Sequence, residues 1–288
     1  MRLYAFDDHR LGVLSEPGRL VDITSLVGLD VASPDRMTAL ISGWAELGDR
    51  VRAASDTHEG AALDGAHLLA PQPRPGKIIA APVNYRLHQQ EMGGTAGVYS
   101  GVTVKTIETY AGFIKASSSI VGPHGVIELP PGDRRIDHEA ELGVVIGRSA
   151  RNVHRDDALE YVFGYVPLLD ITMRGEEDRS FRKSFDTFTP IGPAIVTADE
   201  VGDPGELDLT LTVDGEIRQA SNTREMIFDV ARLIELYSGA MTLTPGDLIA
   251  TGTPEGVGAL EPGQQVTLEV ERVGRLVMPV RVQATAVR

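Results

Sequence analysis

The chain has 288 residues, of which 42% are hydrophobic, so it can bury one large core or a core with a small additional domain. It carries 27 Lys and Arg against 41 Asp and Glu, a formal net charge of -14 that disfavours nucleic acid and anionic membranes as partners. The absence of cysteine excludes disulfides and thiolate chemistry. With no signal-peptide pattern and no apolar run of about 18 residues, we expect a soluble, cytoplasmic protein.

The first 70 residues are predicted to form a small N-terminal domain. Short strands separated by turns are followed by one helix, for which Ser33 is the expected N-cap. The prolines and glycine of residues 70–77, APQPRPGK, then interrupt regular structure. We therefore predict a boundary there, with the N-terminal domain over residues 1–70 and a larger domain over residues 71–288.

The larger part of the chain is expected to be dominated by strands. A hairpin is predicted around Asp214-Gly215, a pair that suits the positive φ angles of a tight turn. One helix is expected from about Thr223 to Tyr237, ended by Gly239. Several strands with few helices predict an α+β, β-dominated fold with an antiparallel or mixed sheet. Apolar runs indicate further strands at residues 77–83, 141–147 and 160–172.

Two glutamates open the apolar run IDHEAELGVVIG, residues 136–147. On a strand Glu139 and Glu141 would face the same side, with Cα atoms roughly 6.5–7 Å apart. Two carboxylates that converge in this way repel each other unless a cation lies between them. Oxygen ligands favour a hard divalent ion such as Mg²⁺ or Ca²⁺. The alternative is an exposed strand end at which both side chains are solvated.

A third carboxylate, Asp170, ends the apolar run YVFGYVPLLD. Together with the glutamates it would complete a three-carboxylate site, although an aspartate at this place also commonly caps a turn. Arg174 and Lys183 follow within a short distance along the chain. Beside a metal they would hold an anionic substrate or a developing enolate; otherwise they are surface cations.

His88 and Glu91 lie three residues apart in NYRLHQQE. On a helical turn they share a face, so Glu91 could orient the imidazole as a general base. An exposed polar turn is the alternative. The glycine-rich residues 92–106 that follow are predicted to form a mobile lid.

The stretch TGTPEGVG, residues 251–258, lacks the spacing and the lysine of a nucleotide-binding loop. Its backbone amides and the hydroxyls of Thr251 and Thr253 could bind a substrate carboxylate. A tight turn between strands is the alternative interpretation.

In this order, the segments from Lys77 to about Val280 resemble the fumarylacetoacetate hydrolase family. The resemblance implies a mixed β-roll or barrel fold and a homodimer. It also implies one Mg²⁺ or Mn²⁺, with Ca²⁺ as a possible substitute, bound by Glu139, Glu141 and Asp170. The segments that carry it are NYRLHQQE, FIKASSSIVGP, DHEAELGVVIGRSARNV, DALEYVFGYVPLLDITMR, KSFDTFTPIGPAIVT, LTVDGEIRQ, MIFDVARLIELYS and LTPGDLIATGTPEGVG.

The same resemblance assigns roles to the remaining candidate residues. It makes His88 and Glu91 the catalytic dyad and Lys183 a catalytic lysine. The chain departs from the family pattern Asp-x-x-x-Arg-Asp-x-Gln, because Gly175 and Glu177 stand where the second aspartate and the glutamine would be. The segment between the dyad and residue 113 is also longer than in compact members. The substrate-binding positions that the resemblance implies are Arg174, Gly252 and Thr253.

The function expected is metal-dependent hydrolysis of the C–C bond of a β-diketo acid, such as an acylpyruvate, through a metal-stabilised enolate. The partner is then a small anionic keto acid. Alternatives on the same site are a decarboxylase, an isomerase or a dehydratase of a 2-keto acid. An alternative from another class is a metal-binding protein without turnover.

Overall fold

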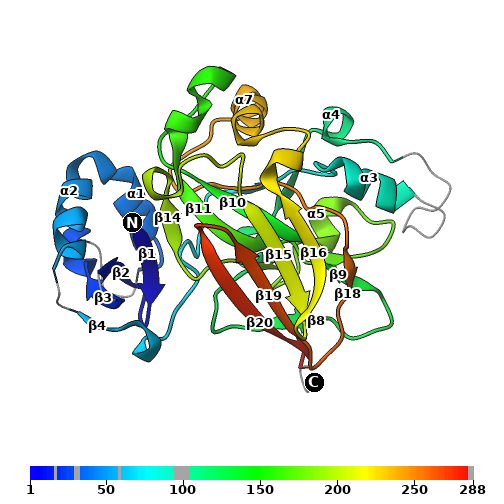
Figure 1. Cartoon of the computed structure of the whole chain (residues 1–288), viewed down its shortest axis with the longest axis horizontal. Coiled ribbons are helices and arrows are strands. Elements are labelled where there is room, and N and C mark those ends of the chain that lie inside the picture. Colours follow the sequence, from blue (N-terminus) through cyan, green and yellow to red (C-terminus); the bar gives the residue numbers. More distant parts are fainter. Residues whose placement is uncertain (16–17, 29–32, 58–59, 94–103, 285–288) are drawn as a thin grey trace.

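The computed structural model describes residues 1–15, 18–28, 33–57, 60–93 and 104–284. One mixed sheet of ten strands is the largest sheet of the fold (Figure 1). Most neighbouring strands are antiparallel, while β17 and β5 run parallel. The strand-rich fold predicted from the sequence is confirmed. In sheet order the strands are β4 (Ala61–Ala62), β3 (Arg19–Asp22), β2 (Arg10–Ser15), β1 (Arg2–Phe6), β14 (Ile195–Thr197), β11 (Val162–Leu169), β10 (Ala140–Ile146), β17 (Leu248–Ala250), β5 (Ile78–Ala80) and β6 (Phe113–Lys115).

A second sheet of five strands packs against the centre of the first (Figure 1). It contains the predicted hairpin, whose turn residues Asp214 and Gly215 have φ angles of 52° and 84°. In sheet order its strands are β16 (Glu216–Asn222), β15 (Asp208–Val213), β19 (Gln265–Val270), β20 (Gly274–Val282) and β8 (Ile127–Leu129). Smaller pairings join β9 (Ile136–His138) to β12 (Thr172–Met173) and β18 (Gly258–Ala259), and β7 (Ile120–Val121) to β13 (Thr189–Pro190).

Strand β10 is buried on both faces, which explains its unbroken apolar run. Val144 belongs to the core cluster shared with the second sheet, which includes Leu211 and Leu268. Val145 points to the opposite face and joins a second cluster with Ile41 of the N-terminal helices. The glutamates at the start of β10 are therefore held by a strand that both layers fix in place.

The predicted single N-terminal helix is two helices, α1 (Arg36–Ser42) and α2 (Trp44–Ser55), divided at Gly43. Glycine has the lowest helix propensity after proline, and here ψ of 9° ends the first helix. Ser33 is not the N-cap: Asp35 takes that position, and the Ser33 hydroxyl accepts a hydrogen bond from the Asp35 amide at 3.3 Å.

The predicted helix over residues 223–237 was placed too early. After a short 3-10 turn at residues 223–225, the helix α7 runs from Val230 to Ala240, and Gly239 lies inside it. The backbone of Ile227 and Phe228 forms hydrogen bonds with Asn84 instead of helical ones. The Asn84 carbonyl accepts from the Ile227 amide, and its side chain bonds both the amide and the carbonyl of Phe228. Asp229 then caps α7 by accepting from the Arg232 amide at 2.8 Å.

The N-terminal segment shares a sheet with the rest of the chain. Strand β1 pairs with β14, and its residues join a core cluster that includes β10 and β17. The division into a small N-terminal domain over residues 1–70 and a larger domain over residues 71–288 remains a prediction. The remaining helices are α3 (Arg86–Gly93), α4 (Ile107–Tyr110), α5 (Arg179–Arg182) and α6 (Ala198–Val201), with 3-10 helices at residues 24–26, 63–65, 117–119 and 155–161.

Of the predicted lid over residues 92–106, the stretch 94–103 lies outside the described residues. Among the residues described, none of the helices has both the length and the apolar character required to cross a bilayer.

Candidate active site

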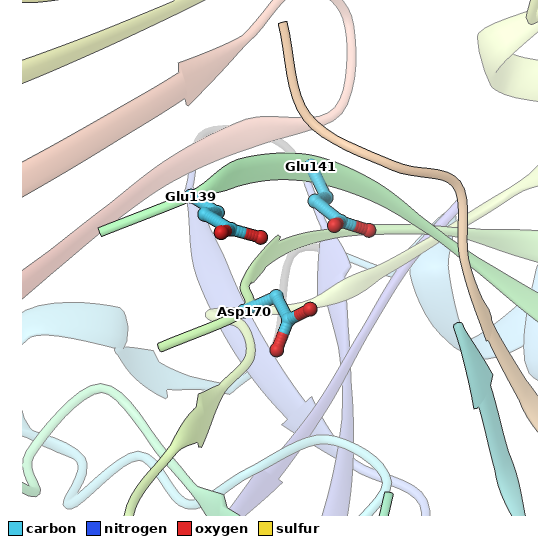
Figure 2. Close-up of side chains that lie close together, drawn as sticks. All are labelled: Glu139, Glu141 and Asp170. Atoms are coloured by element: carbon cyan, nitrogen blue, oxygen red, sulfur yellow. The ribbon is translucent and has the colours of Figure 1, made fainter. Parts of the chain in front are cut away.

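Glu139, Glu141 and Asp170 converge at one end of the β10–β11 pair (Figure 2). Glu139 lies at the junction of β9 and β10, Glu141 lies on β10, and Asp170 directly follows β11. The antiparallel register places Asp170 beside Glu139, and the Asp170 amide donates to the Glu139 carbonyl at 2.9 Å. One oxygen from each carboxylate lies within 4.8 Å of the others, and all three residues are buried. Their arrangement is that of a site able to hold a metal ion.

Buried lysines partly neutralise this cluster. Lys183 Nζ donates to Glu139 at 2.7 Å, to Asp170 at 2.6 Å and to the Thr172 hydroxyl at 2.6 Å. Lys115, on strand β6, donates to Asp170 and to the Phe188 carbonyl. Lys115 was not predicted, although a lone lysine directly after the apolar pair Phe113-Ile114 was a signal that a buried acid lay nearby.

The carboxylates are not electrostatically equivalent. Burial and the charge of Asp170 raise the pKa of Glu141 well above its usual range. For Glu139, burial raises the pKa, but the opposing charges of Lys183 and Arg174 outweigh it and the net shift is downward. In the described part of the chain no Lys or Arg side chain hydrogen-bonds Glu141; its partner is the Gly252 amide at 2.8 Å. A divalent cation would supply the positive charge that Glu141 lacks, so the donor set fits a metal.

Arg174 is part of the same charge network and not an ordinary surface cation. Its Nε donates to Asp137 at 2.7 Å and a terminal nitrogen donates to Glu139 at 2.9 Å, with 9% of the side chain exposed. Asp137 was also missed, although Asp137, Glu139 and Glu141 alternate along the sequence and so share one face.

His88 and Glu91 lie on α3, as predicted, and His88 is buried. The Nδ1 atom of His88 lies 3.1 Å from one carboxylate oxygen of Glu91. The other oxygen of Glu91 accepts from the Gly256 amide at 2.9 Å, which fixes the glutamate to the loop after β17. Glu91 therefore fixes the orientation of the His88 imidazole, and the Gly256 amide in turn fixes Glu91.

The loop of residues 251–258 mainly organises the site. The Thr251 hydroxyl donates to the Leu142 carbonyl at 2.9 Å, and the Gly252 amide is engaged by Glu141. The expectation for Gly252 changes accordingly: its amide positions a carboxylate instead of facing a substrate. Thr253 lines the pocket, and its hydroxyl oxygen accepts from Gln219 at 2.8 Å.

Gln219, from the hairpin strand β16, was not anticipated by the sequence argument. Besides Thr253, it contacts the Ala140 amide at 3.0 Å and His138 Nδ1 at 3.2 Å through its side-chain oxygen. His138 thus bonds Gln219 and does not line the pocket. Nothing in the sequence identified Gln219, because it reaches the site from a hairpin about 80 residues away.

One pocket brings these groups together. Beside the carboxylates it is lined by His88, Arg174, Lys183 and Thr253, so the predicted metal ligands, the histidine of the dyad and the predicted cations face the same space. Glu91 lies behind His88. The α5 segment adds Arg179 and Arg182. An apolar wall completes the pocket and consists of Ala81, Pro82, Val83, Met92, Val104 and Phe113.

The Gly175 and Glu177 departures from the family pattern lie outside this pocket. Glu177 makes a two-pronged salt bridge to Arg134, at 2.6 and 2.7 Å, and both side chains are exposed. A Cβ at position 175 would meet the Arg134 guanidinium, so the glycine allows this pairing. Glu177 therefore does not replace a substrate-binding glutamine; it stabilises the outer surface of the segment.

Similarity to known proteins covers nearly the whole chain. The chain is 41% identical over 286 residues to maleylpyruvate hydrolase of Aquipseudomonas alcaligenes, and the match covers 98% of this chain and 99% of that protein. The crystal structure of maleylpyruvate hydrolase from Sphingobium sp. SYK-6, in complex with manganese(II) ion and pyruvate, superposes with a TM-score of 0.87 at 39% identity, covering 99% of this chain and 100% of that one.

Relatives that catalyse other reactions are also similar. Oxaloacetate tautomerase Fahd2a, mitochondrial, of Rattus norvegicus is 39% identical over 222 residues, which cover 73% of this chain and 68% of that protein. The family described as fumarylacetoacetate (FAA) hydrolase C-terminal matches residues 77–281. With its strand-rich fold and its buried carboxylates on β10 and β11, the chain belongs to the fumarylacetoacetate hydrolase family of enzymes.

Proposed function

We propose that this protein hydrolyses the C–C bond of an acylpyruvate, with maleylpyruvate as the leading candidate substrate. The observation that carries the proposal is that a buried three-carboxylate site and a carboxylate-oriented histidine face one pocket. Similarity to maleylpyruvate hydrolases over nearly the full length of both chains supports it. The reaction consumes water and yields pyruvate and the carboxylic acid of the acyl group.

A divalent cation held by Glu139, Glu141 and Asp170 is part of this proposal. The all-carboxylate donor set suits Mg²⁺ or Mn²⁺, and a structural neighbour contains manganese(II). When bound, such a cation supplies Lewis-acid stabilisation of the negative charge that develops on the keto-acid oxygens. The network around the site keeps the ligands in place, since Lys183 and Gly252 each hold a carboxylate.

His88 is the proposed general base. Because Nδ1 is engaged by Glu91, the proton of an attacking water would pass to Nε2. Glu91 stabilises the imidazolium that results, and the Gly256 amide keeps Glu91 in position. Water attack on the acyl carbonyl then breaks the C–C bond, and the proton held by His88 returns to the departing pyruvate carbon.

The other predicted residues divide between positioning and binding. Lys183 uses all three of its ammonium protons on Glu139, Asp170 and Thr172, so its role is to hold the ligands more than to bind substrate. Thr253 accepts from Gln219, which leaves its own hydroxyl proton to donate to a substrate oxygen.

A keto-enol tautomerase or isomerase is the second candidate, favoured by the similarity to the oxaloacetate tautomerase. The same pocket would serve, but His88 would move a proton between substrate atoms and no water would attack. The two candidates predict different products from the same substrates.

Product analysis tests the proposal. The purified protein is supplied with Mg²⁺ or Mn²⁺ and incubated with maleylpyruvate, acetylpyruvate and oxaloacetate. Hydrolysis predicts equimolar pyruvate and carboxylic acid, with activity lost in EDTA and restored by the metal. Interconversion without fragments would support the tautomerase instead. Release of CO₂ as the main product would contradict both.

A further inference from the structure

The α5 side of the pocket is positively charged. Asp178 caps α5 by accepting from the Ser180 amide at 2.8 Å, and the helix then presents Arg179 and Arg182 to the pocket. Arg182 is buried and donates to the backbone carbonyls of Glu177 and Met173, at 3.2 and 3.4 Å. It therefore fixes the segment, whereas Arg179 makes a different kind of contact.

The Arg179 guanidinium lies 4.0 Å from the ring centre of Tyr110, on α4. A cation held over an aromatic face is fixed in position without using its N–H donors. In the described ranges of the chain no carboxylate forms a salt bridge with Arg179. Arg179 is partly buried and lines the pocket, so it presents a pre-positioned set of donors to whatever occupies that space.

The arrangement of the pocket indicates which part of a substrate the N–H groups of Arg179 would contact. The keto-acid end of an acylpyruvate belongs at the carboxylate site, and its acyl chain then extends along the apolar wall that includes Val104 and Phe113. A substrate that ended in a methyl group would leave the Arg179 guanidinium without an anionic partner. A substrate with a second carboxylate would pair with it through two parallel N–H···O bonds.

We propose that Arg179, held over Tyr110, binds the distal carboxylate of a dicarboxylic acylpyruvate and thereby selects diacids over acylpyruvates with an apolar tail. The inference rests on the proposed function for the identity of the keto-acid end. It adds a specificity-determining residue that acts on binding of the far end of the substrate and leaves the proton transfers to His88.

Kinetics with two substrates test this assignment. Arg179→Gln should lower kcat/KM for maleylpyruvate by about 10- to 100-fold, mainly through KM, because a charge-assisted pair is lost. For acetylpyruvate, which lacks the second carboxylate, kcat/KM should change by less than about 2-fold. Arg179→Lys should fall between the wild type and Arg179→Gln with maleylpyruvate, because it keeps the charge but not the planar pair of donors.

A matched control is available elsewhere in the chain. Arg148 also lies over a tyrosine ring, 4.3 Å from the centre of Tyr161, but outside this pocket. Arg148→Gln removes the same kind of ring contact, together with an exposed salt bridge to Glu160, and should leave both substrates unaffected. An equal loss with both substrates in Arg179→Gln, or no loss with either, would overturn the proposal.

A binding measurement separates this proposal from the proposed reaction. In the Mn²⁺-loaded protein, 2-oxoheptanedioate should bind more tightly than 2-oxoheptanoate, which differs only by a methyl group in place of the far carboxylate. Arg179→Gln should abolish that difference. If the wild type hydrolyses no acylpyruvate yet shows the preference, the reaction is wrong and the role of Arg179 stands. If the wild type hydrolyses acylpyruvates and shows no preference, the role of Arg179 is wrong.

Discussion

The two ends of the segment 177–183 each form salt bridges, and these salt bridges differ in how deeply they are buried. At one end Lys183 pairs with Glu139 and Asp170, where the side chains are 7%, 6% and 1% exposed. At the other, Arg134 and Glu177 pair with 41% and 42% of their side chains exposed. Both regions consist of a cation hydrogen-bonded to a carboxylate.

Burial decides what the pairing can do. A buried charge that loses its partner is strongly destabilising, whereas an exposed pair contributes little because water and salt screen it. The buried end is therefore a constrained site suited to chemistry. The exposed end accepts the Gly175 and Glu177 departures without disturbing the carboxylates. Arg179 lies between the two ends, where a change alters substrate choice without dismantling the metal site.

The largest effect is expected from Asp170→Asn. Loss of this charge leaves buried Lys115 and Lys183 short of a partner, so the free energy of unfolding should fall by about 3–5 kcal/mol. Metal binding and turnover should be lost with it. Urea unfolding and calorimetric titration with Mn²⁺ measure the two effects. Glu177→Gln, in the exposed pair, is the control, and wild-type Mn²⁺ affinity in Asp170→Asn would remove this residue from the metal site.

The His88→Ala variant should lower kcat by about 10²- to 10⁴-fold, because an oriented general base is lost. Its Mn²⁺ affinity should be close to that of the wild type, since the hydrogen-bond partner of His88 is Glu91 and His88 is not among the three grouped carboxylates. Steady-state kinetics at saturating metal give the first value and titration gives the second. Full activity in the variant would show that the dyad has no catalytic role.

A smaller effect is expected from Gln219→Met, which preserves the shape of the side chain. The buried Ala140 amide and the Thr253 hydroxyl lose a hydrogen-bond partner, so the free energy of unfolding should fall by about 1–3 kcal/mol. The substrate KM should rise because Thr253 is no longer held. Denaturant unfolding and substrate titration provide the two readouts; unchanged values for both would mean that the bridge is dispensable.

The smallest effect is expected from Arg134→Ala, at the exposed end. Its hydrogen bond to Glu177 lowers the pKa of that carboxyl from 4.5 to about 2. The folded-state pKa is depressed, so the stabilisation is present above about pH 4.5 and is lost as pH falls towards 2. Thermal unfolding of wild type and variant should differ slightly at pH 7, and the difference should shrink across that window and in high salt. A difference that grew on acidification would contradict this account.

Much of the site was predictable because short-range geometry determines it. The alternation of Glu139 and Glu141, an aspartate at a strand end and the three-residue spacing of His88 and Glu91 are local patterns. The hairpin turn at Asp214-Gly215 is local in the same sense. The boundary of α7 was predicted wrongly because Asn84, far away in the sequence, binds the backbone that would have extended the helix.

The sequence by itself thus determined the fold class and predicted the three carboxylates and the pairing of His88 with Glu91, since backbone periodicity and the resemblance to the family are properties of contiguous residues. Only the tertiary structure decided that Lys115 and Gln219 lie at the site. It also decided that the Gly252 amide donates to Glu141, and that Arg179 lies over Tyr110. Those contacts join segments that are distant along the chain, and a side chain acquires such a partner only when strands and loops pack together.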